Sequence, residues 1–188
     1  MRDGARTKDL IEKTALRLFV KKGLKETTIR DIASAAKLSE GALYRHYGGK
    51  DELAWALFSQ NFTGFAQELD HIQRRHRTLN AKLDAMVRHF CAFFDKDSVL
   101  FSYLLLTQHA QLQRVTPEMS HPMLVLRAAI AGGMARGEIP KRDPDVATSM
   151  VMGMVLQVAV NKIYGRIKAD LSSLADQLVT GAWRVLQS

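Results

Sequence analysis

Hydrophobic residues recur at intervals of three and four positions along most of this 188-residue chain, which is the spacing of one helix face. No segment shows the alternation of apolar and polar residues that marks a strand. The longer predicted helices are Thr7–Lys22, Lys50–Arg75, Leu79–Phe94, Ser98–Leu112, Pro122–Arg136, Pro144–Arg166 and Leu171–Leu186. With two short helices between residues 28 and 47, the chain is predicted to be all-α, with about nine helices.

Several of these helices have an identifiable reason to begin or end where they do. Gly23 is placed to end the first helix, and Gly137 follows Arg136 as a stop signal. Pro122 and Pro144 suit first helical positions. Asp143 can cap the helix that Pro144 opens.

Residues 27–47 predict two short helices joined by a tight turn. Thr28 can cap the first helix, Asp31 suits its positive end, and Ser39 can cap the second. Only three or four residues around Lys37 remain for the turn, which is the geometry of a helix-turn-helix. Only Leu43 of the second helix clearly points inward, so the remaining residues are expected outward or along its edge: Glu40, Gly41, Ala42, Tyr44, Arg45 and His46.

The residues of this region resemble the N-terminal domain of the TetR family of transcriptional regulators, strongly over residues 8–55. The resemblance rests on the joint order of Ile11, Ala15, Leu18, Phe19, Gly23, Thr28, Ile32, Ala33, Ala36, Leu38, Ser39, Gly41, Leu43, Tyr44, His46, Tyr47, Lys50 and Leu53. Two residues depart from the family pattern: Lys37 stands where Gly is usual in the turn, and Tyr47 replaces Phe. A left-handed backbone at Lys37 would cost about 1 kcal/mol.

The resemblance implies a helix-turn-helix DNA-binding domain over residues 1–50 and a helical effector-binding and dimerisation domain over residues 51–188. It also implies which side chains position the first domain on the phosphate backbone: Thr28, Ser39, Tyr44, His46 and Lys50. The alternative is packing against the first helix for Tyr44 and a capping role for His46.

Base reading is assigned by matching side-chain chemistry to base edges. Arg30 and Arg45 can grip a guanine edge, and Glu40 can accept a hydrogen bond from cytosine. Ala42 is a candidate contact for a thymine methyl group. Gly41, like Ala42, is small enough to let the helix approach the bases closely.

The segment Pro144–Arg166 is apolar almost all round, so it is expected to be covered on more than one side. Together with the last helix it resembles the family's dimerisation surface, whereas the alternative is that both helices are merely core. The candidate dimer contacts are Val151, Val155, Val158, Leu171, Leu174, Leu178 and Trp183. A symmetric dimer places two recognition helices about 34 Å apart, so a palindromic operator is expected.

The family mechanism implies an effector cavity in the C-terminal region, and an apolar compound fits flexible Met side chains. Its candidate residues are Met86, Phe90, Phe93, Phe94, Phe101, Tyr103, Leu104, His109, Met119, Met123, Met150, Met154 and Gln157. The alternative for most of them is ordinary core packing. No cofactor or metal site is expected.

Charge and composition agree with this interpretation. The chain carries a formal net charge of +8 and 47% hydrophobic residues, enough for a substantial core. Residues 1–50 hold 12 Lys or Arg against 6 Asp or Glu, a basic excess that favours DNA once the turn motif is present. One cysteine excludes an internal disulfide, and the polar start and the short longest apolar run (Met150–Val160) predict a cytoplasmic protein with no membrane span.

Two other function classes stay open at this point. An enzyme would have to use Cys91 beside His89 or the pair His71 and His76, but neither pair has a productive helical spacing. The second alternative is a helix-turn-helix regulator without a small effector. The sequence therefore predicts a homodimeric, ligand-responsive transcriptional regulator, with repression favoured because an occupied operator excludes polymerase.

Overall fold

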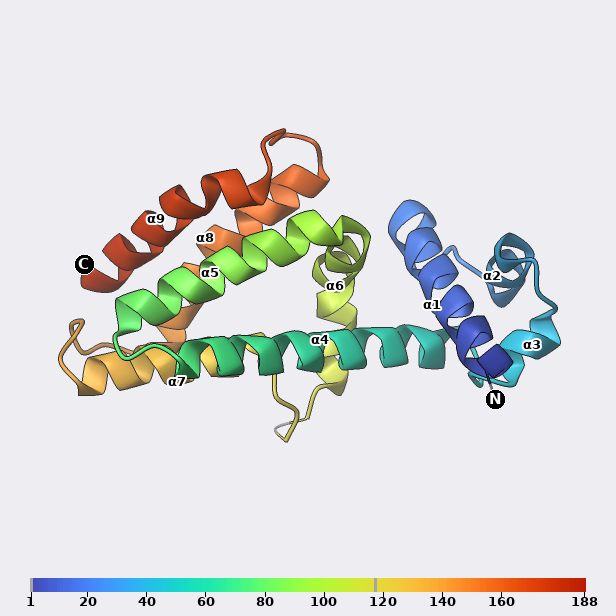
Figure 1. Cartoon of the computed structure of the whole chain (residues 1–188), viewed down its shortest axis with the longest axis horizontal. Coiled ribbons are helices and arrows are strands. Elements are labelled where there is room, and N and C mark those ends of the chain that lie inside the picture. Colours follow the sequence, from blue (N-terminus) through green and yellow to red (C-terminus); the bar gives the residue numbers. More distant parts are fainter. Residues whose placement is uncertain (1, 117) are drawn as a thin grey trace. The chain divides into compact units, whose positions relative to one another are not determined.

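The computed structural model describes residues 2–116 and 118–188, and all regular structure in these residues is helical (Figure 1). The α-helices are α1 (Arg2–Lys22), α2 (Ile29–Ala36), α3 (Glu40–Tyr44), α4 (Lys50–Arg74), α5 (Leu79–Lys96), α6 (Ser98–Gln111), α7 (Pro122–Ala135), α8 (Pro144–Ile163) and α9 (Ala175–Gln187). Short 3-10 turns lie at Leu112–Arg114 and Leu171–Leu174. The all-α prediction is confirmed, with nine α-helices in the described residues.

Most predicted helix ends match the structure because their causes are local. Asp143 accepts hydrogen bonds from the amides of Asp145 and Val146 at 2.8 and 3.3 Å, so it caps α8 as expected. Three ends differ. α1 begins at Arg2 rather than Thr7. The last segment opens with a 3-10 turn before α9, and α8 stops at Ile163 because Gly165 follows with a φ of +71°.

One compact unit runs up to Asn61 and also includes Val99–Val115, so α6 packs with the N-terminal helices. Tyr103 of α6 is fully buried in this unit. Its hydroxyl donates to the Ala54 carbonyl at 2.6 Å, and its ring stacks on Phe19 with centroids 5.7 Å apart. Tyr103 is therefore a core anchor of this unit.

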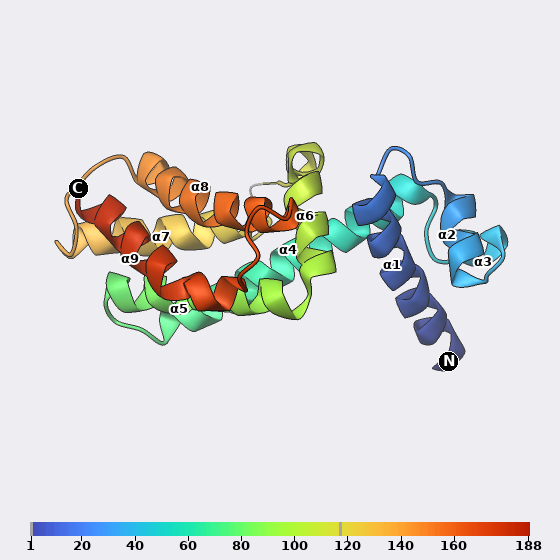
Figure 2. The same ribbon diagram turned by 90° about the horizontal axis from the view of Figure 1, so that it is seen from above.

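The second unit comprises Phe62–Ser98 and Thr116–Ser188. Within it α9 lies beside α5 and α8, and α7 lies beside α8 (Figure 2). A Cβ atom added to Gly133 would come within 2.5 Å of the Leu79 side chain, so α5 and α7 approach too closely for any larger residue. Glu138 ties the same two helices together by accepting from the Leu79 amide and the Arg136 guanidinium.

By length and composition alone, one helix in the described part of the chain, α8, could cross a membrane. α8 has 20 residues, a mean hydropathy of 1.4 over its most apolar window, and 28% of that window buried. Isolated apolar helices of this kind also occur in the cores of soluble proteins. α8 packs between α7 and α9, so it is an element of the second unit.

Candidate nucleic-acid interface

The first helix of the motif, α2, begins with a capping box. The Thr28 hydroxyl accepts from the Asp31 amide at 3.1 Å, and the Asp31 carboxylate accepts from the Thr28 amide at 2.8 Å. Lys22 of α1 pairs with the same carboxylate at 2.8 Å. These partners, Lys22 foremost and then Thr28, lower the pKa of Asp31 to about 2. The predicted cap is confirmed, and Lys22 joins α1 to it.

The turn between α2 and α3 has a left-handed residue at its centre. Lys37 has a φ of 56°, the only positive φ outside glycine among the described residues. Its amide donates to the Ser34 carbonyl at 3.1 Å, and the Leu38 amide donates to Ala33 at 2.9 Å. These bonds end α2 in the way that a left-handed glycine usually ends a helix. Lys37 therefore has the left-handed backbone that costs a residue with a Cβ atom about 1 kcal/mol.

The second helix, α3, contains only five residues and is capped by Ser39, whose hydroxyl accepts from the Ala42 amide at 3.2 Å. Leu43 is buried, whereas the Tyr44 side chain is 55% exposed. Glu40, Gly41 and Arg45 are exposed as well, and His46 is half-buried. The outward surface expected for α3 is present at these positions.

Ala42 is an exception to that surface. Only 6% of it is exposed, because it lies on the same side of α3 as Leu43 and packs into the domain core. The outward position expected for Ala42 is wrong, and no thymine contact is assigned to it here.

The basic side chains proposed to contact DNA differ in whether they already have a hydrogen-bond partner within the protein. Arg30 and Arg45 are exposed on α2 and directly after α3. The Lys50 ammonium at the start of α4 donates to the Lys25 carbonyl at 3.1 Å. A phosphate contact by Lys50 therefore requires that this internal bond be shared or exchanged.

One contact of this domain joins residues too distant in sequence to be predicted. The Tyr47 hydroxyl donates to Glu12 of α1 at 2.5 Å, although 35 positions separate them. In the sequence, Tyr47 is only a mild departure from the Phe of the family pattern. Nothing near it in the sequence indicates that its hydroxyl bonds to Glu12.

The alternative enzymatic pairs lack the chemistry of a catalytic site. Burial raises the pKa of the Cys91 thiol to about 11, so the thiolate nucleophile is disfavoured. His89 points to Glu68 at 2.7 Å, and His71 contacts Arg75 at 2.6 Å. Among the described residues no group of three or more His, Cys, Asp or Glu side chains is placed to hold a metal ion.

The predicted effector residues are distributed over both units. Phe101, Tyr103 and Leu104 are buried in the first unit, and Met86, Phe90 and Phe94 in the core of the second. Phe93, Met119 and Met154 of the second unit are half-buried. The exposed members are His109, Met123, Met150 and Gln157.

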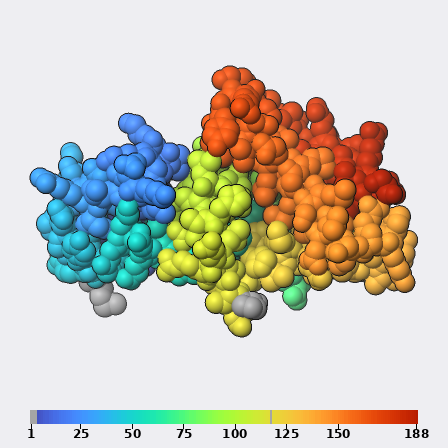
Figure 3. Space-filling model, turned by 180° about the vertical axis from the view of Figure 1, so that it is seen from behind, coloured from blue at the N-terminus to red at the C-terminus, as the bar shows by residue number. Residues whose placement is uncertain are grey.

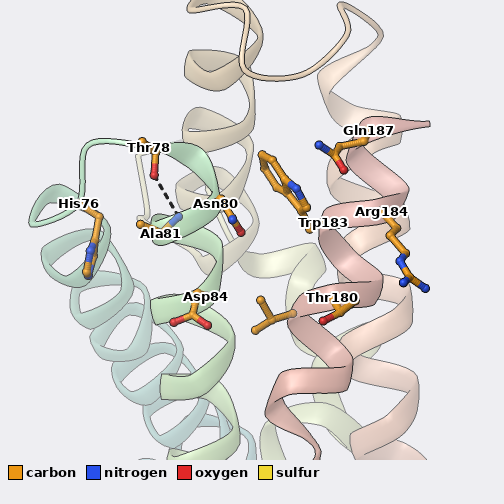
Figure 4. A pocket seen from close by; sticks show the side chains of 10 residues that line it. His76, Thr78, Asn80, Ala81, Asp84, Thr180, Trp183, Arg184 and Gln187 are labelled. Atoms are coloured by element: carbon orange, nitrogen blue, oxygen red, sulfur yellow. Dashed lines mark hydrogen bonds between the residues drawn. The ribbon is translucent and has the colours of Figure 1, made fainter.

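A pocket of about 570 Å³ lies elsewhere in the second unit, between the start of α5 and the end of α9 (Figure 4). Trp183 projects into it from α9 towards Asn80 of α5, and Asp84 lines the pocket further along α5. Its other lining residues are His76, Thr78, Ala81, Val179, Thr180, Arg184 and Gln187. None of the effector candidates belongs to this lining.

The predicted dimer contacts divide by burial. Val151, Val155, Leu171 and Leu178 lie in the core of the second unit and present no surface to a partner. Val158, Leu174 and Trp183 are half-buried. The exposed apolar residues of α8 are instead Val146 and Met150, at 53% and 51%.

Comparison with known proteins supports the DNA-binding geometry. Residues 11–57 match the family described as bacterial regulatory proteins, tetR family. YerO, an HTH-type transcriptional regulator of Bacillus subtilis, is 50% identical over 46 residues, which cover 24% of this chain and 16% of YerO.

Two solved structures extend the likeness over nearly the whole fold. The fatty acid degradation regulator FadR of Bacillus halodurans superposes with a TM-score of 0.82 at 19% identity, covering 93% of both chains. FadR of Bacillus subtilis in complex with stearoyl-CoA gives 0.75 at 18% identity, covering 92% of this chain and 96% of that one.

Proposed function

We propose that this chain, whose residues 11–57 match the tetR family of bacterial regulatory proteins, is a homodimeric transcriptional repressor of that family and not an enzyme. It binds a palindromic operator in the cytoplasm, and a small apolar effector releases it. The observation that carries the proposal is the pair of capped helices α2 and α3. They hold Tyr44 and Arg45 outward on a domain with a basic excess.

On the operator, α3 enters the major groove and the polar groups around it contact the backbone. Tyr44 and His46 donate to phosphate oxygens, and Thr28 and Ser39 add contacts at the two helix N-termini. Arg30, Glu40 and Arg45 read base edges, and Gly41 allows close approach. Lys50 exchanges the Lys25 carbonyl for a phosphate, which is a stronger acceptor because it is charged.

The dimer forms through the outward face of α8, which faces the viewer in Figure 3. Val146 and Met150 are the large apolar side chains exposed on this helix. Gly153 and Gln157 continue the same exposed row toward its C-terminal end. Apolar exposure on an otherwise packed helix is typical of a protein interface, and α9 packs beside α8.

The effector is an apolar molecule that fits among Met and aromatic side chains, and an acyl chain has this chemistry. The support comes from stearoyl-CoA in the Bacillus subtilis FadR complex and from the Met-rich composition of the second unit here. The ligand must bind the DNA-incompetent conformation more tightly than the competent one, because otherwise it shifts no equilibrium.

The proposal is tested in two steps. First, the protein selects DNA from a random pool; we expect enrichment of an inverted repeat whose half-sites are about one helical turn or a multiple of it apart. Second, acyl-CoA thioesters of graded chain length are added to the complex, with free CoA as the control. Release by long-chain thioesters but not by CoA supports an apolar effector.

The second candidate is a regulator without a small effector. One observation favours it: six of the predicted effector residues are buried in the core of one unit or the other, and none of the candidates lines the pocket between α5 and α9. The second candidate is supported if the protein enriches an operator but neither acyl thioesters nor any compound of a broader screen releases the protein from that DNA. A pool from which no sequence is enriched would contradict both.

A further inference from the structure

A buried tyrosine hydroxyl anchors the segment that follows α3. The Tyr47 side chain is 6% exposed, and its hydroxyl donates to Oε1 of Glu12 at 2.5 Å. Phenylalanine, the usual residue of the family pattern, would fill the same space without this bond. The hydroxyl therefore adds a directed link between α1 and the end of the recognition helix, beyond what ring packing supplies.

Lys8 completes the cluster on α1. Its ammonium lies 3.8 Å from the same Glu12 oxygen and 5.9 Å from the centroid of the Tyr47 ring. Burial, together with the Glu12 carboxylate, raises the pKa of the Tyr47 phenol. The phenol therefore stays protonated, and can donate, throughout the range in which proteins bind DNA.

The geometry of α3 makes such an anchor consequential. A helix of five residues has little stability of its own, so its direction depends on what holds its ends. Leu43 is the buried anchor within α3, and the amides of His46 and Tyr47 both donate to its carbonyl at 2.9 Å. The residues proposed to contact DNA, Tyr44 to His46, lie between these two anchors.

We propose that Tyr47 and Glu12 form a positioning pair for operator recognition: their hydrogen bond fixes the turn that carries Tyr44, Arg45 and His46, and neither residue touches DNA. This inference rests on the proposed operator-binding function. Of the residues on this turn, Arg45 needs the most exact placement, because a two-pronged contact to a base edge tolerates less displacement than the single phosphate contacts of Tyr44 and His46. Loss of the pair should therefore reduce chiefly the advantage of the operator over other DNA.

The test uses the full-length protein and the operator that it selects. Tyr47→Phe keeps the ring, and Glu12→Gln keeps the side-chain shape but weakens the acceptor. We expect each to lower operator affinity by about threefold to tenfold, the range of one hydrogen bond. Affinity for unrelated DNA should change by less than about twofold, and Tyr47→Phe should leave the salt dependence unchanged because no phosphate contact is lost.

Asp9→Asn is the matched control. It removes one negative charge from the same helix, and Asp9 pairs with Lys13 at 2.8 Å on the exposed face of α1. We expect it to leave operator specificity unchanged. The double variant Tyr47→Phe with Glu12→Gln should bind no more weakly than the weaker single variant, because both remove the same bond.

Full operator affinity in Tyr47→Phe overturns the positioning role while leaving the proposed function intact. Equal losses on all sequences, or losses that add in the double variant, overturn it too. A wild-type protein that enriches no sequence removes the proposed function itself, and the inference with it. Thermal unfolding of each variant separates loss of positioning from loss of folded protein.

Discussion

At the scale of single residues, Lys37 is the clearest point of stored strain. A left-handed conformation costs a residue with a Cβ atom about 1 to 2 kcal/mol, and glycine avoids that cost but loses more chain entropy on folding. We expect Lys37→Gly to raise the free energy of unfolding by about 1 kcal/mol, measured by chemical denaturation. Lys37→Ala is the control, because it removes the charge but keeps the strain; equal stabilisation by both would exclude backbone strain as the cause.

Arg45 and Lys50 separate base reading from charge neutralisation. Arg45→Ala should relax preference at one operator position by about 1 to 3 kcal/mol.

Lys50→Ala should weaken binding to all sequences and reduce the slope of log affinity against log salt by about one. Both effects are measured by titrating each variant protein against the operator and its single-base variants at several salt concentrations. A uniform loss in Arg45→Ala would refute its assignment to a base.

Residues whose partners are near in sequence are the predictable ones. Thr28, Ser39 and Asp143 bond to amides two or three positions away, so a short motif is enough to identify them. Tyr47 finds Glu12 across 35 positions and Lys50 finds the Lys25 carbonyl across 25, and only the fold brings these together. The base-contact residues stay predictions, because exposure alone does not show what they touch.

At the scale of elements, the capping box of α2 should make its stability depend on acid. The pKa of Asp31 falls from 3.8 to about 2 in the folded chain. A lowered pKa means that the carboxylate stabilises the fold fully above about pH 4 and loses that effect as pH falls towards 2. Asp31→Asn should flatten this acid limb in thermal unfolding curves, whereas Asp9→Asn, an equal charge change outside any cap, should flatten it less.

The helices were predictable where the hydrophobic periodicity and the capping residues indicate the same segment. α8 shows what periodicity alone does not predict. Its sequence is apolar almost all round, so the pattern does not indicate which face enters the core. The structure buries Ala147, Val151, Val155 and Ala159, one residue every fourth position. Packing against α7 and α9 makes this choice, so two of the three interface residues predicted on α8, Val151 and Val155, are core residues.

At the scale of the whole molecule, contacts between distant segments decide the grouping of helices. α6 joins the N-terminal unit because Tyr103 meets Phe19 and Ala54, which lie far from it in sequence. A boundary drawn after residue 50 from the motif alone does not contain this information. That boundary stays a prediction about where the DNA-binding function ends.

The exposed face of α8 gives the proposed dimer its most direct test. An isologous interface repeats every residue across its twofold axis, so one new charge is paired with a second like charge in a desolvated surface. Met150→Lys should therefore convert the dimer to monomers in sedimentation experiments and lower operator affinity by more than about tenfold, because paired half-sites then bind independently. Ala92→Lys adds the same charge at an exposed position of α5 and should leave both properties unchanged. A Met150→Lys protein that stays dimeric and retains operator affinity would place the interface on another surface.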